Sequence, residues 1–141
     1  MNRRQYLYFF LLYLLLGSCN QNKSKLSNNN NKVRKDSSQT AQLEFLNRRI
    51  DFGKVSNDTT LSGRFSFVNT GKKDLLIYEV VPDCSCTSFE LSKKQIKPGD
   101  SAYIILNMAT LHKFGETKIY STVTANTPER IYSLEIIANV E

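Results

Sequence analysis

Apolar and polar residues alternate along most of the chain after Gln42, and turn-forming residues interrupt the alternation at short intervals. A period of two is typical of strands that bury one face, and no helical period of useful length is visible. The segments predicted to be strands are 43–46 with 50–52 as a first strand in two pieces, 61–68, 75–81, 89–91, 103–108, 119–123 and 132–140. About seven short strands within roughly 100 residues predict an all-β fold, a single immunoglobulin-like β-sandwich over residues 41–141.

The same alternation predicts which side chains are buried. Phe65 and Phe67 fall on one face of their strand, and Met108 falls on the buried face of segment 103–108, as a core residue rather than a metal ligand. The last strand buries Tyr132, Leu134, Ile136, Ala138 and Val140. Segment 75–81 is almost continuously apolar, so we expect a central strand that is covered on both faces.

Turn signals separate the predicted strands. Asn69 and Gly71 lie in a segment that predicts a tight hairpin, because both residue types tolerate the positive φ that such a turn requires. Pro98 and Gly99 predict a type II turn, in which proline sets a negative φ and glycine takes the positive one. The residues expected to form turns are Gly53, Asn69, Gly71, Pro98, Gly99 and Asn126.

The N-terminus is typical of a secretory signal. Arg3 and Arg4 precede an uncharged run over residues 6–18. At about 1.5 Å per residue this run spans about 20 Å as a helix, less than the roughly 30 Å of a bilayer core. The run ends in Leu16-Gly17-Ser18-Cys19, which has the form of a bacterial lipobox. We therefore expect a lipoprotein signal peptide over residues 1–18 and a lipid on Cys19 that anchors the chain to a membrane, the alternative being an ordinary signal with a chance cysteine.

Residues 19–40 are expected to be a flexible polar tether that begins at the lipidated cysteine. Only Leu26 and Val33 are apolar between residues 20 and 40, too few to offset the entropy of ordering the segment. Residues 20–23 lack the acidic run associated with surface export in Bacteroidota, and no Asp follows Cys19 as an inner-membrane retention signal. We expect a cell-envelope location, on the outer membrane and facing the periplasm.

The net charge of +6 does not indicate a nucleic-acid partner, because of where the charges lie. The excess is +2 over residues 1–18 and +4 over residues 19–40, whereas residues 41–141 hold 12 basic and 12 acidic residues. A nucleic-acid-binding domain shows a basic face on the domain itself. We therefore expect no nucleic acid among the partners.

Several motifs occur together in a characteristic order. They are Asp51-Phe52-Gly53-Lys54-Val55, Asn69-Thr70-Gly71, Asp74-Leu75-Leu76-Ile77, Cys84-Ser85-Cys86-Thr87, Pro98-Gly99-Asp100-Ser101, Gly115 and Asn126. In order and spacing they resemble the bacterial family called domain of unknown function 1573, over roughly residues 42–141. The resemblance implies an exported Ig-like sandwich, often lipid-anchored and common in Bacteroidota, with a fold similar to Hydin-like and pilus-chaperone domains, which bind other chains. Ser85 stands where the family usually has Gly.

Two cysteines remain once Cys19 is set aside for lipidation, and they form one pair in a compartment where disulfides persist. On an extended chain the Cα atoms of Cys84 and Cys86 lie about 6.6 Å apart, near the limit for a disulfide, and a turn brings them closer. Three interpretations stay open: a small structural disulfide or thiol pair, a thiol–disulfide exchange site, or a Cu(I) or Zn site.

His112, the only histidine, is the natural third ligand of such a metal site. Connections in an Ig-type meander alternate between the two ends of the sandwich. Loops 84–86 and 111–115 are therefore expected at one end, together with the turn at 55–59, and the tether enters at the opposite end.

Enzyme chemistry has little support in the sequence. There is no Gly-rich phosphate loop, no paired-carboxylate spacing and no nucleophile motif, so we expect no small-molecule substrate and no cofactor. The sequence favours a membrane-anchored, non-enzymatic binding or scaffolding module. We expect it to contact an unidentified envelope protein through a sheet edge or through the end of the sandwich that carries Cys84 and Cys86. The alternative is a thiol-redox or copper- or zinc-handling protein that uses Cys84 and Cys86.

Overall fold

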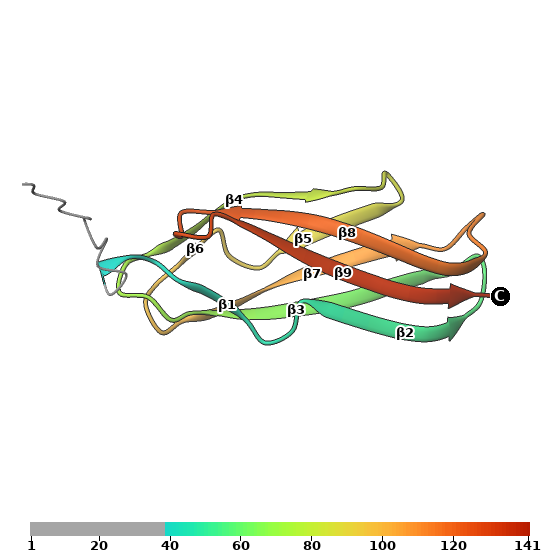
Figure 1. Cartoon of the computed structure of the whole chain (residues 1–141), viewed down its shortest axis with the longest axis horizontal. Coiled ribbons are helices and arrows are strands. Elements are labelled where there is room, and N and C mark those ends of the chain that lie inside the picture. Colours follow the sequence, from blue (N-terminus) through green and yellow to red (C-terminus); the bar gives the residue numbers. More distant parts are fainter. Residues whose placement is uncertain (1–38) are drawn as a thin grey trace, which may run out of the picture. The chain divides into compact units, whose positions relative to one another are not determined.

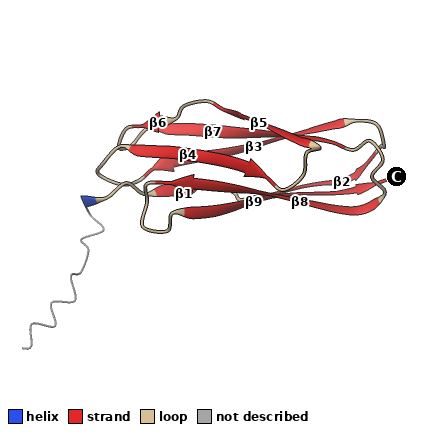
Figure 2. Ribbon diagram, turned by 90° about the horizontal axis from the view of Figure 1, so that it is seen from above, coloured by secondary structure: helices blue, strands red, loops and turns tan. Residues whose placement is uncertain are grey.

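The structure, a computed structural model, describes residues 39–141. Two β-sheets pack face to face, as Figures 1 and 2 show, which confirms the predicted all-β, Ig-like sandwich. No helix within residues 39–141 is long and apolar enough to cross a membrane. The expected signal peptide over residues 1–18, the lipidated Cys19 and the tether up to residue 38 lie outside the described residues.

Within residues 39–141, nine strands form the two sheets. They are β1 (Leu43–Phe45), β2 (Arg49–Val55), β3 (Thr60–Asn69), β4 (Leu75–Pro82), β5 (Thr87–Leu91), β6 (Gln95–Ile96), β7 (Ser101–Ala109), β8 (Gly115–Ala125) and β9 (Ile131–Val140). One sheet has the order β1-β3-β7-β5 and the other the order β2-β9-β8-β4-β6. Every pairing is antiparallel except that of β2 with β9, which is parallel.

The first strand is in two pieces, as the sequence predicts, and the pieces belong to different sheets. β1 pairs with β3, and β2 pairs with β9 in the opposite sheet. The crossing is marked by two backbone hydrogen bonds: the amide of Leu46 donates to the Ser66 carbonyl, and the amide of Glu135 donates to the Arg48 carbonyl. The two pieces thus form an edge strand of each sheet, β1 in one and β2 in the other.

The alternating positions form the core between the sheets. Phe65 and Phe67 are fully buried, and so is Met108, which lies among apolar side chains as expected. All five residues predicted to be buried on the last strand are buried. The period of two therefore predicted side-chain direction correctly on β3, β7 and β9.

The expectation of a fully covered strand at 75–81 is wrong. On β4, Tyr78 is 52% and Val81 45% exposed, because the outer face of this sheet faces solvent. A bulge between Ile77 and Glu79 shifts the register against β8. On its other edge β4 pairs with β6 only through Leu75 and Leu76, so the rest of that edge has no partner strand within the described residues.

The hairpin expected around Asn69 and Gly71 is also wrong, because β3 and β4 belong to different sheets. Neither residue has a positive φ. Asn69 is fully buried and bonds backbone groups, whereas Gly71 is required by a close approach: a Cβ there would lie 2.3 Å from the carbonyl oxygen of Thr40. Thr40, assigned above to the tether, already binds the sandwich through the amide of Lys72.

The other predicted turn residues act in different ways. The type II turn is present, with a φ of 82° at Gly99 and a hydrogen bond from the Asp100 amide to the Lys97 carbonyl. Gly53 lies in a bulge within β2, not between strands, with a φ of 65°. Asn126 binds the backbone of β4, accepting from the Leu76 amide at 2.8 Å.

Candidate functional site

The site built around Cys84 and Cys86 lies in the turn between β4 and β5. The two sulfur atoms are bonded in the structure, and the Cα atoms lie 5.1 Å apart, closer than on an extended chain. The Thr87 amide donates to the Cys84 carbonyl at 3.0 Å, which closes a β-turn with Ser85 and Cys86 at its centre. Ser85 has no positive φ, so a side chain fits where the family resembled above usually has Gly.

Neighbouring strands hold this turn in place. The Asp83 amide donates to the Tyr120 carbonyl on β8, and the Ala109 amide at the end of β7 donates to the Cys86 carbonyl. Both cysteines are half-buried and pack against the core. The disulfide is therefore fixed by both sheets and still reaches the surface.

The loop between β7 and β8 lies beside the disulfide. The Nζ atom of Lys113 is 3.9 Å from the Sγ atom of Cys84. The sequence did not single out Lys113, because the residue of interest in this loop was His112 as a candidate metal ligand. The predicted meander placed this loop at the same end of the sandwich as the cysteines, and that part is confirmed. The positive charge of Lys113 within the loop was therefore a signal that could have identified it.

Hydrogen bonds of Thr110 connect that loop to the turn at residues 55–59. Its hydroxyl accepts from the Thr59 amide at 2.9 Å and lies 3.1 Å from the Ser56 carbonyl and 2.9 Å from the Thr59 carbonyl. The Lys113 amide donates to the Thr110 carbonyl, which closes a turn through Leu111 and His112. All three loops predicted at one end thus lie together.

His112 does not join the cysteines. It is exposed, with a φ of 62° at the corner of the turn. Within residues 39–141, no group of three His, Cys, Asp or Glu side chains is placed to hold a metal ion. The alternative ligand set of Cys84, Cys86 and His112 is not assembled in the structure.

Two large apolar side chains project from the same loop. Leu111 is 51% and Phe114 75% exposed. Residues 39–42, where the described chain enters the sandwich, lie at the opposite end (Figure 1). The loop that carries these side chains thus lies at the end of the sandwich opposite residues 39–42.

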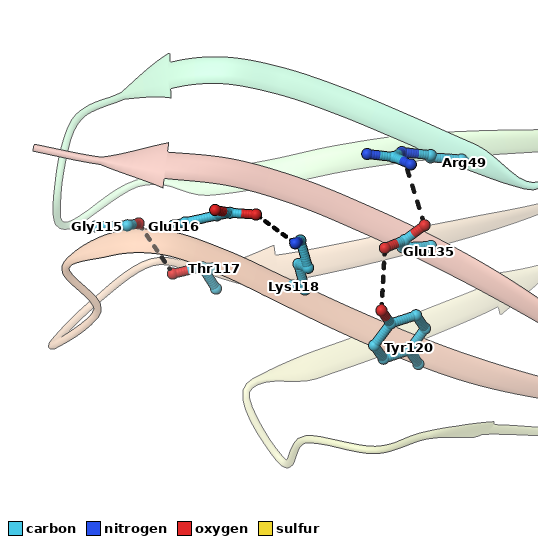
Figure 3. A network of polar contacts seen from close by, with 7 residues as sticks. All are labelled: Arg49, Gly115, Glu116, Thr117, Lys118, Tyr120 and Glu135. Carbon is cyan, nitrogen blue, oxygen red and sulfur yellow. Dashed lines mark hydrogen bonds and ion pairs between the residues drawn. The ribbon is translucent and has the colours of Figure 1, made fainter.

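A second polar cluster lies on the outer face of β8 and β9 and is shown in Figure 3. Glu135 accepts from the Tyr120 hydroxyl at 3.1 Å and pairs with Arg49 at 3.7 Å, and Lys118 pairs with Glu116. The hydrogen bond and charge of Glu135 raise the pKa of Tyr120, and those of Glu116 raise the pKa of Lys118. Glu135 is 20% exposed, but the side chains of Arg49, Lys118 and Glu116 are exposed, so these ion pairs are screened by solvent.

An open hollow beside this cluster carries both signs of charge. It is lined by Arg49, Asp51, Gly53, Lys54, Glu116, Ile137, Ala138 and Asn139. Three of the charged side chains in this region are already paired, Arg49 with Glu135, Lys54 with Glu141 and Glu116 with Lys118. The side chains that line the hollow therefore do not favour one class of ligand.

Comparison with known proteins shows which sequence family the chain matches and which solved structures have a similar fold. The pattern of the family described as "Protein of unknown function (DUF1573)" matches residues 43–140. No curated protein sequence matches the chain.

Three solved structures illustrate the likeness in fold. A protein of unknown function from Porphyromonas gingivalis W83 is 17% identical, with a TM-score of 0.65, and the match covers 77% of this chain and 51% of that one. The VesB protease of Vibrio cholerae is 8% identical, with a TM-score of 0.54 over 72% of this chain and 32% of that one. The ASH/PapD-like domain of human CEP192 is 11% identical, with a TM-score of 0.52 over 73% of this chain and 87% of that one. This chain thus spans about half of the first relative, and the likenesses show the fold alone.

Proposed function

The chain belongs to the DUF1573 family of proteins of unknown function, and from that premise we propose that it is a lipid-anchored protein-binding module of the bacterial cell envelope, with its anchor on the outer membrane facing the periplasm. The anchor is supported by the lipobox that ends at Cys19. Binding is supported by the fold, since Ig-like and PapD-like sandwiches are scaffolds that present loops and strand edges to other chains.

The observation that carries the binding function is the exposed pair of Leu111 and Phe114. Large apolar side chains that stay in water cost free energy, and at interfaces they act as anchors when they lie on a rigid support. The hydrogen bonds between Thr110 and the backbone of Ser56 and Thr59 supply such a support. The loop is therefore ordered before a partner arrives, which lowers the entropic cost of binding.

A photo-cross-linking residue placed at Phe114 in living cells tests this function. The matched control is Ile131, which is 61% exposed and begins β9. The turn between β8 and β9 lies at the same end of the sandwich as residues 39–42 (Figure 1). We expect one discrete adduct with another envelope protein from position 114, weakened by Leu111→Ser, and none from position 131. Equal adducts at both positions, or an adduct of twice the chain's mass, would contradict the proposal.

The anchor has a separate test. Cys19→Ala removes the only thiol available for lipidation in the lipobox, so the variant is expected to leave the detergent phase in a phase-separation assay. A Ser18→Ala variant keeps a small residue before the cysteine and should partition as the unaltered protein does. Detergent partitioning of Cys19→Ala equal to that of the unaltered chain would refute lipid anchoring.

A further inference from the structure

The disulfide joins two residues whose backbone is already held by hydrogen bonds. Cys84 accepts from the Thr87 amide, Cys86 accepts from the Ala109 amide, and the adjoining Asp83 donates to β8. A covalent link across a single intervening residue removes little entropy from the unfolded chain. The bond therefore contributes little to folding, and breaking it leaves the turn closed by its hydrogen bonds.

The two sulfur atoms differ in their surroundings. The Sγ atom of Cys84 accepts from the Cys86 amide at 3.1 Å and lies 3.9 Å from the Lys113 ammonium. The polar neighbour of the Cys86 Sγ atom is the uncharged Thr87 hydroxyl, at 3.7 Å. Both an ammonium and a backbone N–H stabilise a thiolate, so Cys84 is the better leaving group of the two.

Lys113 is held in position to act on Cys84. Its backbone amide closes the turn that begins at Thr110, and its carbonyl accepts from the Asn57 side chain. In the part of the chain that the structure describes, its ammonium forms no ion pair with a carboxylate. Its charge is therefore not neutralised by a competing partner at the disulfide.

We propose that Cys84–Cys86 is a thiol–disulfide exchange site that oxidises a dithiol, with Cys86 as the sulfur attacked and Cys84 as the sulfur released toward Lys113. A thiolate of the dithiol bonds to Cys86 Sγ, the Cys84–Cys86 bond breaks, and its electron pair remains on Cys84 Sγ as a thiolate. The second thiol of the partner gives its proton to the Cys84 thiolate and attacks the partner's own sulfur in the mixed disulfide, releasing Cys86 as a thiolate that takes up the proton which the first thiol had lost to solvent. Two electrons thus pass from the dithiol to the protein, and the two protons end on Cys84 and Cys86.

This proposal does not rest on the protein-binding function, because it uses different atoms. Leu111 and Phe114 play no part in the transfer, so loss of cross-linking at Phe114 would leave the exchange chemistry intact. The same half-buried disulfide is accessible to a small thiol, which allows a direct test with glutathione and dithiothreitol.

The first experiment determines which sulfur is attacked. The full chain carries Cys19→Ala, so that Cys84 and Cys86 are the only cysteines. It is exposed briefly to reduced glutathione, alkylated with iodoacetamide and analysed by fragmentation mass spectrometry. We expect glutathione on Cys86 and the alkyl group on Cys84, in about tenfold excess over the reverse pattern. Equal labelling, or the reverse pattern, would overturn the proposal.

The second experiment tests Lys113 as a positioning residue through the rate of reduction by dithiothreitol. Lys113→Met is expected to lower the second-order rate about three- to tenfold, and Lys113→Arg to retain most of it. Lys72→Met, at the other end of the sandwich, controls for the loss of one positive charge and should leave the rate unchanged. Circular dichroism shows that each variant is folded. A Lys113→Met rate equal to that of Lys72→Met, or an equal loss with Arg, would overturn the role of the ammonium.

Discussion

The side-chain amide of Asn69, at the end of β3, donates a hydrogen bond of 2.9 Å to the backbone carbonyl of Ile96 in β6. The two strands belong to different sheets, so this bond ties the halves of the sandwich together. The same amide donates to the Lys73 carbonyl, and the side-chain oxygen accepts from the Gly71 amide. One fully buried side chain thus satisfies backbone groups of several segments.

Asn69→Leu should therefore destabilise the domain strongly. Leucine has a similar volume but leaves backbone carbonyls and amides buried without partners, which costs on the order of 3 kcal/mol in total. Urea denaturation measures the free energy of unfolding. Asn139→Leu, at an exposed position on β9, is the control and is expected to change it by less than about 0.5 kcal/mol. Similar values for both variants would show that the Asn69 bonds are not stabilising.

Glycine is required at position 71 for a reason different from that at position 53. Gly71→Ala brings a methyl group against the backbone of residues 40–42, which must move, whereas the space around Gly53 is open and only its positive φ is unfavourable. We expect Gly53→Ala to cost about 1–2 kcal/mol. Gly71→Ala should lower the melting temperature further and increase amide hydrogen exchange around residue 41. An unchanged exchange rate there would contradict the close approach.

Two buried hydroxyl groups should respond in opposite ways to their removal. Ser121 Oγ is buried and has no hydrogen-bond partner among the described residues, whereas the Thr110 hydroxyl bonds the backbone at Ser56 and Thr59. Ser121→Ala is expected to leave stability unchanged or raise it by up to about 1 kcal/mol, since an unpaired buried hydroxyl is unfavourable. Thr110→Val should lower stability by about 1–3 kcal/mol. Thermal unfolding of the two variants side by side distinguishes these outcomes.

Removing the disulfide should have a modest effect on folding. A loop of so few residues gains no more than about 2 kcal/mol from cross-linking, and the turn keeps its backbone hydrogen bonds. Replacing both Cys84 and Cys86 by Ser is expected to lower the free energy of unfolding by at most that amount. An unfolded double variant would show that the bond has a structural role.

Alkaline pH should weaken the domain through Tyr132. Burial raises the pKa of this phenol, which also bonds the Thr127 hydroxyl at 2.7 Å. Because the phenol stays neutral in the folded state while the unfolded state ionises above a pH of about 10, stability falls as pH rises past that value toward the folded pKa. Tyr132→Phe should flatten the decline in melting temperature between roughly pH 9 and 11. A decline of equal slope in the variant would assign the effect to other groups.

The local pattern of the chain determined the faces of its strands. Phe65 and Met108 were assigned to the core correctly, because successive side chains on a strand point to opposite sides whatever the strand pairs with. The turn at Pro98 and Gly99 was also correct, since proline and glycine restrict φ within the turn itself. Such features depend only on neighbouring residues.

Tertiary structure alone decided the features that join distant segments. Lys113 reaches Cys84 across 29 residues, and Asn69 reaches Ile96 across 27. The hairpin expected at Asn69 was wrong because its turn signal cannot tell a link within one sheet from a crossing between two. Similarly, an apolar run such as 75–81 does not indicate whether neighbouring segments cover the outer face of the strand. These contacts depend on strand order and on the packing of one sheet against the other, and neither is encoded within a single segment.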